Sequence, residues 1–462
     1  MKGPSPARLV AALPEAAREV VERLIAEADK REVGLLLVGG PVRDRLLGRG
    51  VRDVDLVVEG EGEPGAAKLA RAAVPRGART VAHQRFGTVR IEVEGAVVDL
   101  ASARAESYEH PGALPTVRSG TLDEDLLRRD FTVNGLAIPL TRAASRGRPG
   151  IVDSGQGRAD LEASTLRVFH PRSFHDDPTR ALRAARLAPR LGFHLARGTR
   201  AALRAALRDG AFGGVSGERF RSEFEKLFSD RSLGLDPSLA LRYLDDWHVL
   251  GALEPGLSLP RECRLPLRRL GRGEVPAEEV WQSGLMLWFA ELEPPLRRRV
   301  LRRLAVRGEP AKRIERFARK RNRWLADIEV ARGRAACDVI LAPLDPTALA
   351  ALDACGGGAA RRRIRRWIQE DRDAVVPVRG SDLVGLGLEG PAVGRGLVRL
   401  RAAWLDRDVV TREQLLALAH ELAARSLRRR KNPPEKKRPA KKQPDEQQPD
   451  EQQPDEKKPK SR

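Results

Sequence analysis

Two aspartates, separated by one residue, occupy a short apolar run that is typical of a β-strand. Asp53 and Asp55 alternate with aliphatic residues in the segment DVDLVV. Successive side chains of a strand point to opposite faces, so we expect both carboxylates on one face. Neighbouring anions repel each other unless cations lie between them, and carboxylate oxygens suit a pair of Mg²⁺ ions. Isolated pairs of this kind also occur on solvated edge strands and in turns.

Asp99 is a third candidate carboxylate, and it lies in another apolar run, residues 97–100. A charge inside such a run costs free energy unless it is paired or bound to a metal. Three carboxylates on neighbouring strands would form a platform for nucleotidyl transfer. On such a platform two metal ions activate a hydroxyl group and stabilise the departing pyrophosphate.

A Gly-Gly turn precedes the acidic pair. Gly39 and Gly40 follow an expected buried strand and come before a helix that we expect to begin near Pro41. Glycine lets backbone N–H groups approach an anion, and the start of a helix adds a favourable field, so a triphosphate can dock there. The turn alone is not specific, because many tight turns contain glycine.

The elements that must position these residues change in type along the chain. A helix and four β elements are expected at residues 15–30, 34–38, 54–58, 88–93 and 96–100. After Asp160 the β pattern disappears, and the next expected helices are residues 178–191, 200–208, 218–228 and 237–244. The sequence therefore predicts an α+β fold, with a small mixed β-sheet and helices in an N-terminal head and an all-α neck and body after it.

The expected domain boundaries follow from these changes. We expect a head at residues 1–150, a helical neck at 151–235 and a helical body at 236–427. Residues 428–462 carry basic blocks and repeated PDEQQ units, with no aliphatic residue larger than alanine. Such a segment buries too little apolar surface to offset its ordering entropy, so we expect it to be disordered.

Composition narrows the class of protein. The 462 residues carry 85 Lys and Arg against 64 Asp and Glu, a net charge of +21 that favours a polyanionic partner. The sequence contains no run of about 18 apolar residues, so we expect no membrane-spanning helix. Charges interrupt the N-terminal apolar run too early for a secretory signal. The three cysteines have no metal or disulfide spacing, which suits a reducing cytosol, so we expect a cytoplasmic protein.

An ordered series of motifs covers roughly the first half of the chain. The motifs are GGPVRDRLLG, DVDLVVEG, FGTV, RAESYEHPGALPTV, RRDFTVNGLAI, VDSGQGRADLEASTLRV, FHDDPTRALRAARLAPRLGF and SGERFRSEFEKLF. In this order they resemble the class II tRNA nucleotidyltransferase and bacterial poly(A) polymerase family, a branch of the DNA polymerase beta-like nucleotidyltransferase superfamily.

The resemblance implies a role for each matching residue. Asp53 and Asp55 would coordinate two Mg²⁺ ions, and Asp99, where many members have Glu, would lie near the attacking 3′-hydroxyl. Other residues would bind the triphosphate, the sugar or the base. These nucleotide-binding candidates are Gly39, Gly40, Arg43, Arg129, Asp130, Asn134, Asp177, Arg180, Arg183 and Arg186.

Asp177 and Arg180 match the family's base-reading element. Three residues apart on a helix, they would face the same way. The carboxylate accepts from an exocyclic amino group and the guanidinium donates to a ring nitrogen, a pattern that adenine and cytosine satisfy. Guanine and uracil would leave desolvated groups unpaired, at about 1–3 kcal/mol each. Alternatively, Asp177 before Pro178 is an ordinary helix N-cap with proline at the first helical position.

The leading hypothesis is template-independent addition of A, with C as a second nucleotide, to the tRNA 3′ end from ATP and CTP. Poly(A) polymerase is the alternative with the same chemistry. An inactive RNA-binding relative would not need Asp53, Asp55 and Asp99 together. A nucleotidyltransferase for small molecules or proteins would need neither the long basic body nor the Asp177/Arg180 pair.

Overall fold

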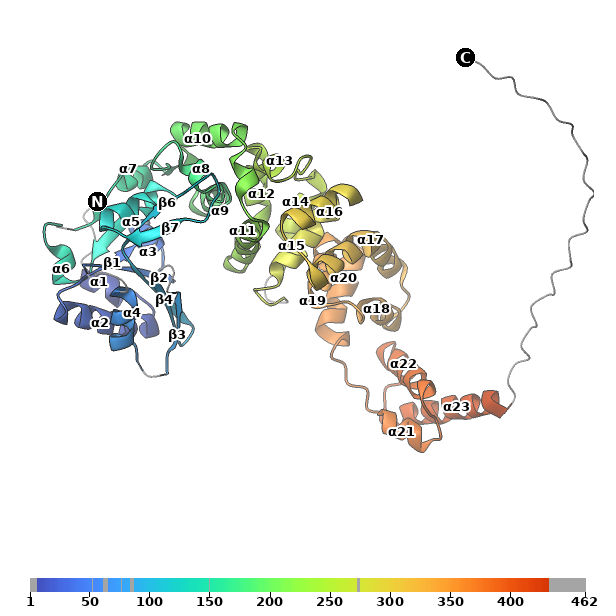
Figure 1. The fold of residues 1–462 in the computed structure, drawn as a ribbon. Helices are drawn as coiled ribbons and strands as arrows, with labels where there is room; N and C mark the ends of the chain where they lie inside the picture. The colour runs from blue at the N-terminus through green and yellow to red at the C-terminus, as the bar shows by residue number, and fades with distance from the viewer. Residues whose placement is uncertain are drawn as a thin grey trace, which may run out of the picture. The chain divides into compact units, whose positions relative to one another are not determined.

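A seven-stranded sheet forms the head of the protein in the computed structural model of Figure 1. Its order is β3-β4-β5-β2-β1-β8-β9, and neighbours are antiparallel except β2 and β5, which run parallel. The strands are β1 (Gly34–Val38), β2 (Asp53–Glu59), β3 (Arg79–His83), β4 (Thr88–Val93), β5 (Ala96–Ser102), β8 (Leu136–Pro139) and β9 (Val152–Asp153). The expected mixed sheet is confirmed.

The structure describes residues 6–51, 53–60, 65–75, 77–83, 87–148, 150–271 and 275–431. Phe86 of the FGTV motif, the side chain of Asp53 and the expected tail from residue 432 onward lie outside them. The chain divides into two units, residues 1–332 with 339–369 and residues 333–338 with 370–462. Every strand that these described residues form belongs to the first unit.

Helices α2 (Glu15–Lys30) and α4 (Gly65–Ala73) cover one face of the sheet and contact strand β5. Burial alternates along β5, with Val98 and Leu100 buried and Asp99 only partly buried. This period of two places Asp99 on the opposite face from the apolar core. The remaining helices of the head are α1 (Pro6–Ala11), α3 (Gly40–Leu46), α5 (Leu122–Leu127), the 3₁₀ helix η2 (Thr132–Asn134), α6 (Arg142–Ser145) and α7 (Gly157–Glu162).

Two further sheets have two strands each. β6 (Arg104–Ser107) and β7 (Thr116–Ser119) are antiparallel, whereas β10 (Thr165–Leu166) and β11 (His194–Leu195) are parallel. The prediction that strands end at Asp160 was therefore wrong for β10 and β11. Two-residue strands are too short to produce an alternating pattern in the sequence.

Helices form the rest of the first unit. They are α8 (Ser173–Asp176), α9 (Arg180–Leu191), α10 (Arg197–Arg208), the 3₁₀ helix η3 (Ala211–Gly214), α11 (Gly217–Ser229), the 3₁₀ helix η4 (Asp230–Leu233), α12 (Pro237–Asp246), α13 (Val249–Leu253), α14 (Arg261–Arg269), α15 (Val280–Phe289), α16 (Pro294–Arg303), α17 (Gly308–Val330), α19 (Pro346–Cys355) and α20 (Gly358–Arg366). Helix α15 packs against α11, where a Cβ on Gly284 would lie 2.2 Å from the ring of Phe228. A larger residue at position 284 would separate these helices.

The second unit has its own apolar cluster, which includes Leu383, Leu400 and Leu415. Its helices are α21 (Gly380–Gly385), α22 (Pro391–Leu405) and α23 (Arg412–Lys431), and the short α18 spans Arg334–Leu341. Helix α23 continues to Lys431, so residues 428–431 are helical rather than part of a tail beginning at Arg428. Arginine and lysine are good helix formers, and the next proline is residue 433.

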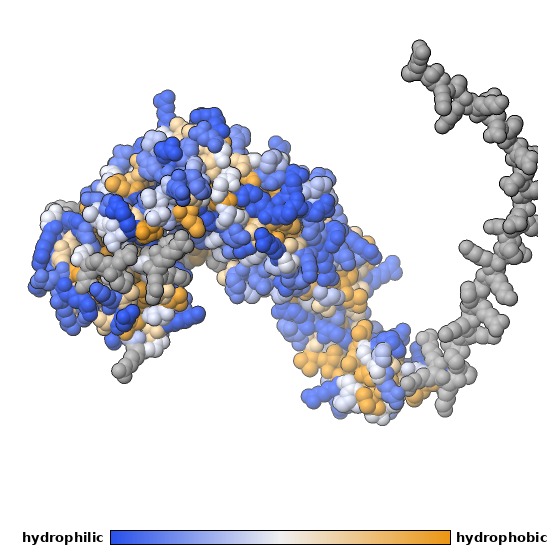
Figure 2. Space-filling model, viewed as in Figure 1, coloured by the Kyte–Doolittle hydropathy of each residue, from blue (hydrophilic) through white to orange (hydrophobic). Residues whose placement is uncertain are grey.

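The visible surface of the first unit is mostly hydrophilic (Figure 2). Figure 2 shows hydrophilic side chains over most of the visible face of the first unit, with smaller hydrophobic areas between them. Within the residues that the structure describes, no helix is both long and apolar enough to cross a membrane.

Candidate functional site

A cavity of about 1350 Å³ is lined by residues of the head sheet, α3, α9 and α11. Its lining contains twelve Arg and Lys side chains against seven Asp and Glu, an excess that suits a polyanion. Predicted site residues in the lining are Gly40, Arg43, Asp55, Asp99, Arg129, Asp130, Asn134, Asp177, Arg180, Arg183 and Arg186. The cavity thus brings head and neck candidates together.

Asp55 and Asp99 lie directly opposite each other on the parallel strands β2 and β5. The next position in this row is Arg90 on β4, the register partner of Asp99. Arg90 donates from Nε to Asp99 Oδ1 at 3.0 Å and from Nη2 to Oδ2 at 2.9 Å. The row Arg90–Asp99–Asp55 therefore crosses three strands on the cavity side of the sheet.

The row offers oxygen ligands for a divalent cation. Two carboxylates from adjacent strands are the donors that Mg²⁺ prefers. Asp53 begins β2 with Val97 as its register partner, but its side chain lies outside the described residues. Among the side chains that are described, no three His, Cys, Asp or Glu residues converge as metal ligands. Asp55 and Asp99 thus supply a matched pair, and Asp53 stays the predicted third ligand.

The Gly-Gly turn brings the start of α3 close to Arg129. Gly39 has φ +74°, and a Cβ there would lie 2.7 Å from Arg129 Nη1. Only glycine satisfies both the backbone conformation and this close approach. Arg43, one turn into α3, is 4% exposed and donates from Nε to Asp44 and from Nη1 to Asn134 Oδ1 at 2.5 Å. Arg43 thus joins α3 to η2 as well as lining the cavity.

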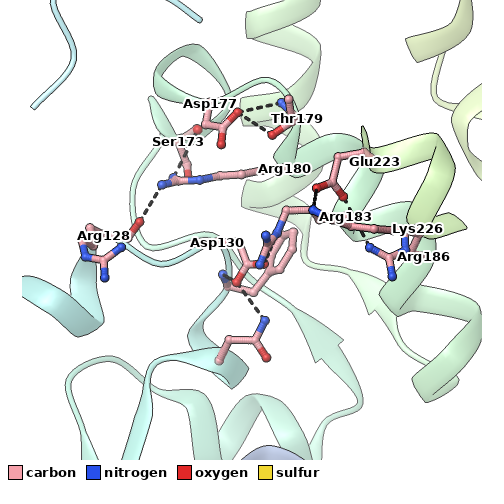
Figure 3. Close-up of polar contacts among 12 residues, drawn as sticks. Arg128, Asp130, Ser173, Asp177, Thr179, Arg180, Arg183, Arg186, Glu223 and Lys226 are labelled. Atoms are coloured by element: carbon pink, nitrogen blue, oxygen red, sulfur yellow. Dashed lines mark hydrogen bonds and ion pairs between the residues drawn. The ribbon is translucent and has the colours of Figure 1, made fainter. Parts of the chain in front are cut away.

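Asp130 is the centre of a buried hydrogen-bond network (Figure 3). Its Oδ1 accepts from Asn134 Nδ2 at 2.8 Å, and its Oδ2 accepts from Arg183 Nε at 2.8 Å. Burial alone would raise the pKa of Asp130, but the charge of Arg183 and the hydrogen bonds from Asn134 and Arg183 lower it to about 2. The carboxylate is therefore ionised at neutral pH and ties the head to α9.

Arg129 is held from below by Asp125 of α5. The side chain of Asp125 is fully buried and accepts from Arg129 Nη2 at 2.9 Å and from Arg128 at 2.6 Å. Burial opposes ionisation of Asp125, but the charges of Arg129 and Arg128 outweigh it and lower its pKa. Arg129 Nε is buried without a hydrogen-bond partner among the described atoms. The fold thus fixes the position of Arg129 Nε without giving it an acceptor among the described atoms.

Asp177 and Arg180 line the same cavity, but they do not share a helix face. Asp177 is extended, with φ −137° and ψ 94°, and α9 begins at Arg180. The expected helix from Pro178 thus starts two residues later, and the expectation that Asp177 and Arg180 lie on one helix was wrong, because the following proline disfavours helical geometry at Asp177. Thr179 directly precedes α9, but Asp177 has the contacts of the N-cap alternative: it is extended, its carbonyl accepts from Arg180 N–H, and its Oδ1 accepts from the N–H and hydroxyl of Thr179.

Both side chains are fixed by other residues (Figure 3). Asp177 Oδ1 also accepts from Arg219 Nη2 at 2.8 Å, which leaves Oδ2 without a hydrogen bond from any described residue. Arg180 is 4% exposed and donates to the Ser173 hydroxyl and to the Arg128 carbonyl, the latter at 2.6 Å. The pair is preorganised rather than free to rotate.

Arg183 and Arg186 have different surroundings on α9. Arg183 uses Nε for Asp130, and 46% of its side chain is exposed to the cavity. Arg186 forms a bidentate pair with Asp230 at 2.9 and 3.0 Å and also contacts Glu223 at 3.4 Å. Arg186 therefore connects the neck helices, whereas Arg183 keeps donors available for a ligand.

Sequence reasoning missed several residues that shape the cavity. Arg90 and Asp125 are the partners of predicted residues, and Tyr108 donates to Glu106, a carboxylate that Arg128 also contacts. Burial raises the pKa of Tyr108. Arg219 binds Asp177 and the carbonyl of Gly112. The sequence around a charged residue does not show which distant residue its side chain will contact.

The chain is similar to known proteins in sequence. A model of the poly A polymerase head domain matches residues 35–167. An A-adding tRNA nucleotidyltransferase of Geobacter sulfurreducens is 31% identical over 424 residues, which are 86% of this chain and 46% of the relative. A CC-adding tRNA nucleotidyltransferase of Deinococcus radiodurans is 33% identical over 368 residues, which are 79% of this chain and 83% of the relative.

Length and fold complete the comparison. The chain spans about half the length, or less, of several curated A-adding relatives that it matches. A solved CCA-adding enzyme, in apo form II, superposes with a TM-score of 0.71 at 25% identity, over 92% of this chain and 100% of that one. The likeness therefore extends beyond the head into the helices.

Proposed function

The chain belongs to the tRNA nucleotidyltransferase family, and we propose that it adds A from ATP to the 3′ end of tRNA, with release of pyrophosphate. The family that the motifs predicted is thereby confirmed. The proposed reaction depends on one observation: the acidic row of the sheet and the preorganised pair Asp177 and Arg180 line a single cavity. CTP is the second candidate substrate, since relatives include both A-adding and CC-adding enzymes.

Divalent metal ions are used generally by nucleotidyltransferases, and we propose Mg²⁺ here, held by Asp53, Asp55 and Asp99. When bound, such ions lower the pKa of the attacking hydroxyl group and neutralise charge on the departing pyrophosphate. Asp55 and Asp99 contribute the opposed carboxylates, and Asp53, two residues before Asp55 in the sequence, is the expected third ligand.

Base selection is proposed for Asp177 and Arg180. Asp177 Oδ2 can accept from the exocyclic amino group of adenine or cytosine, because its other oxygen already bonds Thr179 and Arg219. Arg180 presents a cation that Ser173 and a backbone carbonyl hold in place. Guanine or uracil would leave buried groups unpaired at about 1–3 kcal/mol, which corresponds to roughly 5- to 150-fold discrimination.

Phosphate binding is proposed for the arginines with available donors. Arg183 is half exposed, and Arg129 has a buried Nε without a partner among the described atoms. Both are held by carboxylates, Asp130 and Asp125, so a triphosphate would meet donors already in position. Positioning of this kind accounts for much of the catalysis in phosphoryl transfer.

The tRNA partner and the cytoplasmic location are further parts of this proposal. The net charge of +21 favours a polyanion, and binding dominated by phosphate contacts weakens steeply with salt. Cell fractionation would test the location.

Product length is the direct test. The full chain is incubated with tRNA transcripts that lack the terminal A, the terminal CA or the whole CCA, with ATP and CTP supplied separately. We expect ATP to extend the transcript that lacks only A by one nucleotide. Extension of the shorter transcripts by CTP would add C to the specificity. A long A tail on any RNA would indicate poly(A) polymerase, and no incorporation at all would contradict the proposed function.

A further inference from the structure

The row Arg90–Asp99–Asp55 includes a cation supplied by the protein itself, the guanidinium of Arg90. Asp99 lies between Asp55 on one side and Arg90 on the other, as register partners on β2, β5 and β4. Arg90 contacts both oxygens of Asp99, at 3.0 and 2.9 Å. Like charges directly opposite each other on neighbouring strands are destabilising, and the guanidinium offsets this repulsion.

The contact uses the same atoms that a divalent cation would use. A carboxylate has about four lone-pair positions, and a bidentate guanidinium takes one from each oxygen. Arg90 and a cation on the side of Asp55 therefore act on one carboxylate. The two cations share the charge of this carboxylate and prefer different orientations of it, so the binding of one weakens the binding of the other.

The strength of this contact suits reversible release. The side chains of Arg90 and Asp99 are 51% and 40% exposed, unlike the buried carboxylate of Asp130, which is 3% exposed. Exposed ion pairs contribute little to stability, and removing such a competitor changes affinity by about 1.5- to 5-fold. A pair of this kind holds Asp99 but can be displaced by a divalent cation.

We propose that Arg90 is a positioning residue that holds Asp99 in the metal-free enzyme and competes with the divalent cation for it. The inference rests on the proposed function, because it assumes that Asp99 is a metal ligand. Loading of the cation then loosens the bidentate contact, and the half-exposed guanidinium stays on the cavity wall. The affinity for the cation is set by Arg90 as well as by the carboxylates.

The test measures Mn²⁺ binding to the full chain by electron paramagnetic resonance, without nucleotide or RNA. We expect Arg90→Gln to bind Mn²⁺ about 1.5- to 5-fold more tightly than the native protein. Arg90→Lys keeps the charge but loses the fork geometry, so its affinity should lie between the two. Arg79→Gln, which removes the neighbouring cross-strand pair with Glu92, is the matched control and should bind as the native protein does.

Asp99→Asn separates this inference from the metal assignment on which it rests. Weaker Mn²⁺ binding by Asp99→Asn, together with tighter binding by Arg90→Gln, supports the inference. If Asp99→Asn weakens binding while Arg90→Gln leaves it unchanged or weaker, Arg90 is not a competitor and only the inference falls. If Arg90→Lys equals the native protein, long-range charge rather than the bidentate contact is responsible. Unchanged binding by Asp99→Asn would overturn both assignments.

Thermal unfolding provides a second readout. Arg90→Gln leaves Asp99 opposite Asp55 without the guanidinium of Arg90, so the metal-free melting temperature should fall slightly. A cation that binds only the native state raises that temperature by mass action. We expect Mn²⁺ to raise it more in Arg90→Gln than in the native protein, and an equal rise in both would contradict competition.

Discussion

The two walls of the cavity are built in opposite ways. On the sheet wall, formed by Asp55, Arg90 and Asp99, the side chains of Arg90 and Asp99 are 51% and 40% exposed. On the neck wall, Arg180 is 4% exposed and its guanidinium is held by Ser173 and by a carbonyl. The proposed metal chemistry thus involves half-exposed side chains, whereas the proposed base recognition involves a buried side chain that hydrogen bonds hold in place.

Ligand chemistry explains this difference. A bound metal ion organises its own carboxylate ligands, so their positions need little reinforcement before it arrives. A base is discriminated only if donors and acceptors are already fixed, because a mobile pair would adapt to the wrong edge. Substitutions on the sheet wall should therefore change the rate with little change in stability, whereas substitutions on the neck wall should change both.

Asp55→Asn should have the largest effect. Loss of one carboxylate from the row removes a charge that holds the proposed Mg²⁺, so incorporation should fall about 10³-fold or more. The melting temperature and the affinity for tRNA should change little, because Asp55 is not part of the apolar core. Single-turnover incorporation measures the rate, with Glu92→Gln on β4 as a control that should stay near native. Near-native incorporation by Asp55→Asn would remove the metal assignment.

Arg180→Ala should have an intermediate effect and change two properties together. The preference for ATP over GTP and UTP should fall by roughly 5- to 150-fold, because one member of the base-reading pair is lost. Stability should also fall, by about 1–3 kcal/mol, since the Ser173 hydroxyl and the Arg128 carbonyl lose their partner.

Competition between nucleotides measures the selectivity of Arg180→Ala, and denaturant unfolding measures its stability. Arg204→Ala, exposed on α10, is the control and should change neither. A destabilised variant with unchanged selectivity would mean that Arg180 is only a structural residue of the neck.

Asp130→Asn should show the smallest effect, seen as pH-dependent stability. The pKa of Asp130 is lowered from 3.8 to about 2 on folding, so the ionised carboxylate stabilises the native state above pH 4. That contribution, roughly 2 kcal/mol, is lost as the pH falls from about 4 to 2. Denaturant unfolding at pH 7 and pH 3 should find the variant less stable and its stability less dependent on acid. Equal acid sensitivity in both proteins would show that Asp130 does not link α9 to the head.

The sequence predicted the elements whose pattern is local. The helix Glu15–Lys30 and the strand Gly34–Val38 agree with the structure at both ends. The hairpin around Glu94 and Gly95 agrees as well, since both residues have positive φ, as a tight two-residue turn requires. Alternation and turn chemistry are properties of neighbouring residues, so a single sequence contains them.

Contacts between distant elements were not predictable in this way. The pair Arg90–Asp99 depends on the register of β4 against β5, and a shift by one residue would separate it. The links Arg43–Asn134 and Asp130–Arg183 join segments that only the folded chain brings together. Asp177 and Arg180 fail to share a helix for another reason, because Pro178 disfavours helical geometry at Asp177.

The parallel pairing of β2 and β5 also determines how much of the chain must be synthesised before the proposed site is complete. Parallel neighbours need a long crossover, and here α4, β3 and β4 lie between the two strands in the chain. Such distant pairings close late in folding, and a nascent chain emerges from its N-terminus. A ribosome-bound fragment that ends before β5 therefore has Asp55 but not its opposing carboxylate, and the base-reading residues emerge later still. The proposed nucleotide transfer therefore requires that β5 and the neck have both been synthesised.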